Sequence, residues 1–322
     1  MQRLPFEIIK DILSRLPVKS LMRFRFDIPF QGLWHRVEIL GSCNGLLCLF
    51  VAERLPGFRH ISPIYLWNPS TREYKRVPDA PVGSPRICEI GNTVLGFGYD
   101  PIKNEYKVVR IIYICERTLD SLIWKSDVRV YSLGTGKWKK LGNAPFNIRN
   151  SSSSKAIVNG SIHWLATQEI NSEMSELIIS FDVRNEVFRE IPLPSCVEAK
   201  QHCNFVTILG GCLSLIGSFP GNYVEIWLMK DYGVNGSWTK QFTIEWSYAP
   251  YRNSIDLFPL EILKSGEILI VKNSKKLVLY DPESRGERDL GIHGLPDHFN
   301  SFIFMESLVP LSAQSRHEGH HQ

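Results

Sequence analysis

A chain of 322 residues, 43% of them hydrophobic, is long enough to bury a large core, and its net charge of +4 at pH 7 is mild for this length. Because the 37 basic and 33 acidic residues are scattered along the chain, the composition argues against a nucleic-acid binder. Charges at Arg3, Glu7 and Lys10 leave no room for a signal-peptide core near the start. No window approaches about 18 uninterrupted apolar residues, so we expect no membrane span.

The first predicted element is a short amphipathic helix that ends at Pro17, with Pro5 in its first turn. Its apolar face is formed at helical spacing by Ile8, Ile9, Ile12, Leu13 and Leu16. A second short helix is predicted over about 18–24. Helices this short are marginal in water, so they must dock on the body of the protein or on a partner.

From about residue 39 the pattern changes to short strands separated by tight turns. The turn repeats as Asn44-Gly45, Asn159-Gly160 and Gly210-Gly211, and a fourth copy surrounds Gly266. Asn-Gly and Gly-Gly are favoured where a two-residue hairpin loop needs positive φ. These copies therefore predict hairpins that recur along the chain.

Each turn is followed by a second strand pair, and in three of these pairs two aromatic residues seven positions apart bracket a turn. The aromatic pairs are Trp67 and Tyr74, Tyr131 and Trp138, and Phe181 and Phe188. A unit of four strands recurring about every 50 residues is typical of kelch-like propeller blades. The segment 94–109 supplies the first hairpin of the second blade. The pattern predicts a mainly β fold with about five to six blades, and a stacked pair of β-sandwiches is the alternative.

The last predicted strand, 301–309, would complete a sixth blade or close onto the first one.

Several longer motifs follow one another along nearly the whole chain. They are Leu4–Arg25, Gly41–Cys48, Trp67–Arg72, Gly96–Asp100, Gly160–Trp164, Val224–Tyr232 and Ser307–Leu311. This ordered set resembles a large plant family in which an F-box precedes a C-terminal F-box-associated, kelch-like domain, and which includes S-locus F-box relatives. After Arg25 the sequence departs from that family, so the F-box is expected to be truncated to its first half.

The resemblance implies three regions: partial F-box helices at 1–26, a linker at 27–38 and the F-box-associated propeller at 39–311. The polar residues that follow predict a disordered tail at 312–322. The resemblance also implies a non-catalytic, substrate-recognition adaptor of an SCF-type (Skp, cullin, F-box) ubiquitin ligase. The partners would be a Skp-type subunit, a cullin and an unknown protein substrate. The residues that would face the Skp-type subunit are Leu4, Pro5, Ile8, Ile12, Leu13, Leu16, Pro17 and Leu21.

Two alternatives stay open at this point. The apolar stripe of the first helix could pack on the propeller itself. The chain could also be a propeller-only binding module that has lost its coupling to the ligase and holds its target as a decoy.

Signals for an enzyme are weak. The sequence contains no G-x-S-x-G, Walker or H-E-x-x-H motif. His163 lies in a strand pattern and is interpreted as structural, while His202 and Cys203 are adjacent, which is poor geometry for a metal. We therefore expect no catalytic residue, no metal and no cofactor, and a kelch-like oxidase is the remote alternative. Seven cysteines without a C-x-x-C pair favour reduced thiols and a cytoplasmic or nuclear protein.

Substrate contacts are expected on the loops that join strands and blades, since function on propellers lies on loops. The predicted long loops include 112–126, 166–177 and 245–258. The last of these contains Trp246, Tyr248, Tyr251 and Arg252, which are residue types enriched at binding hot spots. We predict that these four side chains contact the substrate, and the alternative is that the aromatic rings fold back under the loop.

Overall fold

The structure is a computed structural model that describes residues 34–53, 63–81, 87–117, 122–148, 156–170, 173–194, 202–219, 223–245, 257–292, 303–305 and 307–311. Within these ranges the chain forms 21 strands and one 3-10 turn, Asn235–Ser237. None of the helical structure in this part of the chain is long and apolar enough to cross a membrane. The predicted F-box helices and the predicted tail lie outside the described residues.

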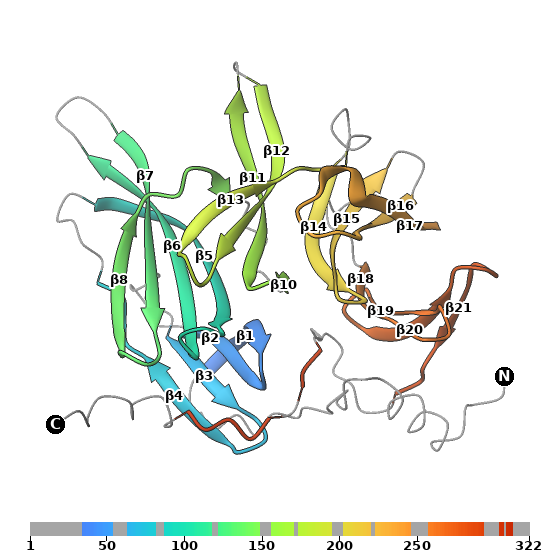
Figure 1. The fold of residues 1–322 in the computed structure, drawn as a ribbon, viewed down its shortest axis with the longest axis horizontal. Helices are drawn as coiled ribbons and strands as arrows, with labels where there is room; N and C mark the ends of the chain where they lie inside the picture. Colours follow the sequence, from blue (N-terminus) through green and yellow to red (C-terminus); the bar gives the residue numbers. More distant parts are fainter. Residues whose placement is uncertain are drawn as a thin grey trace. The chain divides into compact units, whose positions relative to one another are not determined.

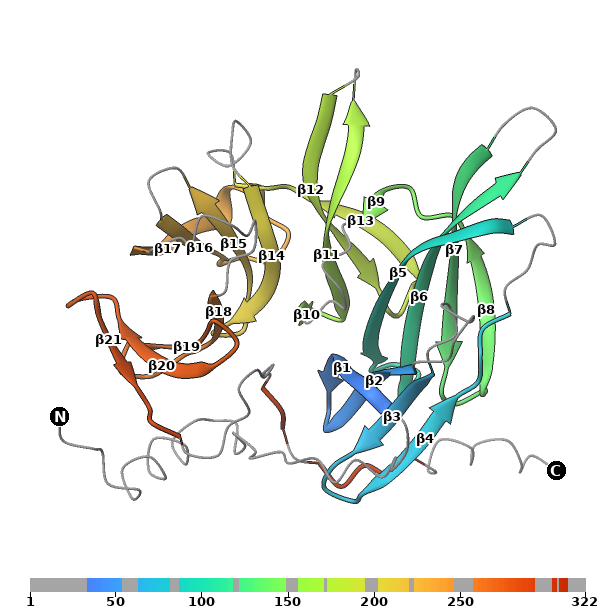
Figure 2. The ribbon, with the colours of Figure 1, turned by 180° about the vertical axis from the view of Figure 1, so that it is seen from behind.

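The contacts divide the chain into two compact units. One unit, Phe26–Glu190 with Glu306–Gln322, holds three sheets, and the other, Met1–Arg25 with Ile191–Met305, holds two. Every sheet is built around four strands that pair antiparallel in sequence order, which is the meander of a propeller blade. The five sheets are called blades 1 to 5 below (Figures 1 and 2).

The first unit contains blades 1, 2 and 3. Blade 1 consists of β1 (Trp34–Cys43), β2 (Leu46–Glu53), β3 (Ile64–Asn68) and β4 (Glu73–Val77). Blade 2 consists of β5 (Ile87–Asp100), β6 (Glu105–Arg117), β7 (Leu122–Ser132) and β8 (Lys137–Gly142). Blade 3 consists of β10 (Ala156–Val158), β11 (Ser161–Ile170), β12 (Glu173–Asp182) and β13 (Val187–Ile191), and the short β9 (Asn147–Ile148) pairs with β11.

The second unit contains blades 4 and 5. Blade 4 consists of β14 (His202–Leu209), β15 (Cys212–Phe219), β16 (Tyr223–Met229) and β17 (Trp238–Glu245). Blade 5 consists of β18 (Leu257–Ile262), β19 (Ile268–Lys272), β20 (Lys276–Asp281) and β21 (Gly286–Asp289). Apolar side chains of the two blades share one core, to which Ile226 and Leu228 contribute from blade 4 and Ile270 and Tyr280 from blade 5.

The predicted hairpin turns are confirmed by their backbone conformation. Asn44 and Gly45 have φ of 47° and 80°, and Asn159 and Gly160 have φ of 50° and 70°. Both central residues are thus left-handed, as a two-residue turn needs if it is to match the twist of its strands. These turns fix the register so that alternate side chains of each strand face the neighbouring blade.

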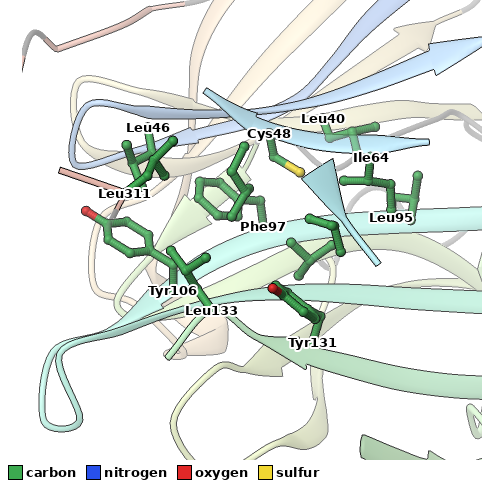
Figure 3. Packing of buried hydrophobic residues seen from close by; sticks show 13 residues of the cluster. Leu40, Leu46, Cys48, Ile64, Leu95, Phe97, Tyr106, Tyr131, Leu133 and Leu311 are labelled. Carbon is green, nitrogen blue, oxygen red and sulfur yellow. The ribbon is translucent and has the colours of Figure 1, made fainter. Parts of the chain in front are cut away.

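The core between blades 1 and 2 shows this alternation. Figure 3 shows Leu46, Cys48 and Ile64 of blade 1 packed with Phe97, Tyr106 and Tyr131 of blade 2. The opposite face of β6 and β7, which includes Val109 and Val128, packs on blade 3. Both faces of blade 2 are therefore buried, which explains the long apolar runs in its strands.

A close approach between blades 2 and 3 explains the glycines of the motif Gly96–Asp100. A Cβ atom on Gly96 would lie 2.6 Å from Cζ2 of Trp164. The indole N–H of Trp164 donates to the carbonyl oxygen of Leu95 at 3.3 Å. The glycine therefore makes room for the buried indole of Trp164.

The end of the chain differs from the prediction. Residues 303–305 and 307–311 form no strand, so the predicted strand at 301–309 is wrong over the residues described there. Residues 307–311, here called the C-terminal strap, lie along blade 1. Asn68 donates its side-chain amide to the carbonyl oxygens of Ser307 at 2.9 Å and Val309 at 2.8 Å, and Leu311 is buried in the core (Figure 3).

The first strand also begins earlier than the sequence indicated. β1 starts at Trp34, within the segment assigned to a linker, and it pairs with β2 along its whole length. A bulge between Ile39 and Gly41 interrupts the alternation, which is why the strand pattern in the sequence is clear only after that point.

Candidate functional site

The residues predicted to contact partners lie outside the described residues. Trp246, Tyr248, Tyr251 and Arg252 fall between the end of β17 at Glu245 and the start of β18 at Leu257. The predicted stripe for the Skp-type subunit, Leu4 to Leu21, precedes β1. Both sets therefore stay predictions, and the described part of the chain supplies other candidates.

In each blade the chain enters the first strand and leaves the fourth strand at the same end, here called the second end, so the connections from one blade to the next start and finish there. In blade 1 the two-residue turn 44–45 and the four-residue turn 69–72 join strands at the first end, whereas residues 54–63 and 78–86 leave from the other. In blades 2 and 3 the strands at this second end are joined by only residues 118–121 and 171–172, and the longer connections, 143–155 (which includes β9) and 192–201, lead to the next blade. The longer connections are thus the place where sequence can vary without changing the blades.

At this second end, the predicted loops 112–126 and 166–177 turn out to be strands. β6 and β7 pair continuously up to Arg117 and Leu122, and β11 and β12 pair up to Ile170 and Glu173. Both predicted loops are therefore wrong over most of their length. The two hairpins extend past their outer strands, and Figure 1 shows both as long projections.

The hairpin of blade 2 carries an exposed aromatic side chain. Trp124 on β7 is 55% exposed, which is unusual for a tryptophan in a sheet. Its ring lies over Gly91 of β5, where a Cβ atom would be 2.8 Å from Cζ3 of the ring. Because Gly91 has no side chain, the indole ring packs directly against the backbone of β5, and the rest of the ring is exposed to solvent.

The opposite face of the same hairpin is basic. Lys125 forms an ion pair with Glu116 at 3.1 Å, and its side chain is 46% exposed. One step along β7 in that face, Asp127 accepts a hydrogen bond from Nε of Arg129 at 2.7 Å and lies 3.4 Å from Nζ of Lys140.

Arg110 completes this cluster from the neighbouring strand. It lies directly opposite Arg129 in the pairing of β6 with β7, and both side chains are buried. Its guanidinium donates to the carbonyl oxygen of Ala80 at 3.5 Å. Burial and the charge of Arg129 lower the pKa of Arg110, while Asp79 and Asp127 partly offset them. Two like charges in direct cross-strand contact are unfavourable, and the carboxylates of Asp127, which is bonded to Arg129, and Asp79 supply the compensating negative charge.

A second buried charge cluster joins blades 2 and 3. Nζ of Lys107 donates to the carbonyl oxygen of Val183 and to Oε1 of Glu186, each at 2.9 Å, and lies 4.0 Å from Oδ2 of Asp100. Burial raises the pKa of the Glu186 carboxyl, but hydrogen bonds from Lys139 and Lys107 outweigh it and lower the pKa. Its members bond mainly to one another, so we interpret this cluster as structural.

Burial favours the neutral form of His163, Cys43 and Cys48. Burial lowers the pKa of His163 to about 4, and its Nδ1 lies 3.1 Å from the carbonyl oxygen of Ala156, to which a protonated Nδ1 donates. Burial also raises the pKa of the Cys43 thiol to about 11 and that of the Cys48 thiol further. Within the described ranges, no three His, Cys, Asp or Glu side chains gather in a way that could hold a metal ion.

Comparisons with known proteins agree with this architecture. Residues 13–315 match the sequence model of the family described as "F-box associated beta propeller domain". F-box protein At3g07870 of Arabidopsis thaliana is 30% identical over 323 aligned positions, which cover 90% of this chain and 74% of the relative. F-box protein CPR1 of the same plant is 28% identical over 378 positions, covering 96% of this chain and 89% of the relative.

Among solved structures, the NanB sialidase of Streptococcus pneumoniae is similar with a TM-score of 0.42 and 8% identity, covering 88% of this chain and 64% of the sialidase. A likeness this slight carries no conclusion about function.

Proposed function

Because the chain belongs to the family of F-box associated β-propeller domains, we propose that it is a substrate-recognition adaptor of an SCF-type ubiquitin ligase. In this proposal the propeller holds the target protein, and other subunits carry the chemistry of ubiquitin transfer. The match over residues 13–315 is the observation that carries the proposal. The projecting hairpins and the longer connections at one end of the blades offer the variable surface that such an adaptor needs.

The proposal assigns the N-terminal segment to the ligase. Its apolar stripe of Ile8, Ile12, Leu13 and Leu16 suits docking of an amphipathic helix in a groove of a Skp-type subunit. A cullin joins through that subunit, and the cytoplasm or the nucleus is the place of action.

A second candidate is a propeller-only binding module without ligase coupling. The resemblance to an F-box stops at Arg25, and β1 already begins at Trp34. The alignment with CPR1 runs over 378 positions although this chain has 322 residues, so the relative contains stretches that this chain lacks. These observations favour a chain that holds a target without delivering it.

Co-purification separates the two candidates. The tagged chain is mixed with a Skp-type subunit and a cullin, and a full-length F-box relative serves as the positive control. Retention of both subunits by the chain supports the adaptor. Retention by the relative alone supports the propeller-only module.

A further inference from the structure

We propose that the C-terminal strap is a releasable clasp, which ties the end of the second unit of the chain to blade 1 and can leave its seat while the strands of blade 1 stay paired. The clasp concerns the propeller alone, so it goes beyond the proposed function and does not rest on it. It gives a role to Ser307–Leu311, the last of the motifs that recur in order along the sequence.

The path of the chain makes the strap a connection between the two units. After blade 3 the chain passes from the first unit to the second between Glu190 and Ile191, and it returns to the first unit between residues 305 and 306. The strap therefore follows directly after the second unit, while Leu311 packs in the core shared by blades 1 and 2. Whatever holds the strap on blade 1 also holds the end of the second unit.

Asn68 forms the centre of the seat on blade 1, and its side chain is fully buried. Its Oδ1 accepts from the backbone N–H groups of Ser70 at 2.9 Å and Thr71 at 3.4 Å. These bonds orient the amide so that Nδ2 donates to the carbonyl oxygens of Ser307 and Val309. Because the turn 69–72 orients the amide, blade 1 supplies a seat that is organised without the strap.

Two further contacts position the two ends of the strap. A Cβ atom on Gly45 would overlap Cβ of Ser307, so the strap lies directly against the hairpin turn of β1 and β2. At the other end, the backbone N–H of Leu311 donates to Oε2 of Glu73 at 2.9 Å, and its side chain lies beside Leu46 in the core (Figure 3). The seat therefore fixes one path for the strap.

The hold on the strap is small compared with the pairing of the strands. Leu308 is 80% exposed, and Leu311 is the one buried residue of the strap. The hydrogen bonds to Asn68 and Glu73 use side chains of the blade, and each contributes little net stability. β3 and β4 pair with each other from Ile64 to Val77 without the strap. A segment held in this way opens locally before the strands do.

The test cuts the chain at its other passage between the units. A protease recognition sequence is placed in the connection between β13, which ends at Ile191, and β14, which begins at His202. The folded whole chain is attached to a surface through an N-terminal tag and is then cut. The second fragment carries the strap and is no longer joined covalently to blade 1, so the rate at which it leaves the surface measures the clasp.

Two variants break the clasp from opposite sides. Asn68→Asp removes both donors to the strap, and Leu311→Gln removes the apolar anchor without changing either turn of blade 1. Each is expected to raise the release rate at least about tenfold over the parent. Gly96→Ala is the matched control, since it disturbs the packing of blade 2 on blade 3 and leaves the strap intact, so it should release as the parent does. Far-ultraviolet circular dichroism before the cut shows that each variant is folded.

Equal release by the parent and both clasp variants, including no release from any of them, overturns the inference because the strap would then not be the hold. An increase in Gly96→Ala as large as in the clasp variants also overturns it, since lost stability would then set the rate. Hydrogen exchange of the uncut Asn68→Asp chain tests whether the clasp is releasable. The amides of β3 and β4 should keep the protection of the parent, and loss of protection there would show that the strap does not open separately from blade 1.

Discussion

Replacing Lys107 by Met removes the cation from the buried junction between blades 2 and 3 while it keeps most of the apolar stem. Lys107 is 1% exposed and Asp100 is fully buried. The substitution removes two hydrogen bonds of 2.9 Å, to Val183 and Glu186, and leaves the Asp100 carboxylate without its counter-charge at 4.0 Å. Removing one partner of a buried ion pair costs about 3–5 kcal/mol, so we expect a loss of this size in the free energy of unfolding.

Lys139→Met is the matched control. Lys139 forms an ion pair with the same carboxylate, Glu186, at 2.6 Å, but its side chain is 67% exposed. An ion pair with an exposed partner contributes at most about 1 kcal/mol, so this variant should lose far less stability. Urea unfolding followed by tryptophan fluorescence measures both variants.

Asp100→Asn in the Lys107→Met background completes the experiment. Neutralising the orphaned carboxylate should recover about 1 kcal/mol or more, although the same substitution in the parent chain should be destabilising. A loss for Lys107→Met no larger than that for Lys139→Met would show that Lys107 is not a required counter-charge, and so would an equal loss of stability from Asp100→Asn in both backgrounds.

Three further predictions concern the blades themselves. Gly96→Ala should destabilise the protein by about 1–3 kcal/mol in urea unfolding, because its Cβ would lie 2.6 Å from the Trp164 ring. Gly236→Ala, with open space around its Cβ, is the control and should be close to neutral. Equal losses in the two variants would contradict close packing at Gly96. His163 has a folded pKa of about 4 against 6.5 in the unfolded chain, so its contribution to stability is present above pH 6.5 and is lost as the pH falls, by about 2 kcal/mol at pH 5. Unfolding free energies at pH 7.5 and pH 5 should show a drop that is smaller by this amount in His163→Asn, and an equal drop in both proteins would refute it. Asn68→Asp keeps the oxygen that accepts from the backbone N–H of Ser70 but cannot donate to the carbonyl oxygens of the C-terminal strap. Hydrogen exchange of the backbone amides of the strap should therefore become faster, while the amides of blade 1 stay protected as before. Unchanged exchange would show that the Asn68 hydrogen bonds do not hold the strap.

The sequence predicted the blades where local chemistry decides the structure. Asn44-Gly45 and Asn159-Gly160 allow positive φ at both central residues, and the apolar alternation on either side sets which face is buried. The aromatic pair Tyr131 and Trp138 was visible as a spacing of seven, and the two residues are cross-strand partners with ring centroids 5.4 Å apart. Such features act over a few residues and can be read directly.

The hairpin with Trp124 was missed although the sequence contains a signal for it. The run Ile111–Cys115 and the segment Leu122–Trp124 are rich in β-branched and aromatic residues, which favour strands over a loop. The strands continue here because β6 and β7 support each other beyond the end of β8. The length of this two-stranded extension depends on where β8 ends, and local strand propensity does not predict that position.

Other features depend on contacts between distant parts of the chain. A lysine is expected at the surface, so the burial of Lys107 follows only from the carbonyl and carboxylate that blade 3 brings to it. In the same way, 301–309 was predicted as a strand from its apolar residues, yet the strap bonds to the side chain of Asn68 instead of a strand edge. The candidate partner residues of the loop 245–258 and of the N-terminal helix stay predictions.

Titration of a purified Skp-type subunit into the purified chain in a calorimeter measures whether this propeller chain connects to a ligase. If it does, one subunit binds per chain in a saturable way, and binding is lost when Ile12 and Leu16 of the apolar stripe are both changed to Asp. Absence of binding by the parent chain, with a full-length F-box relative binding in the same buffer, would contradict the ligase connection. Binding that survives the two substitutions would contradict the assignment of the stripe.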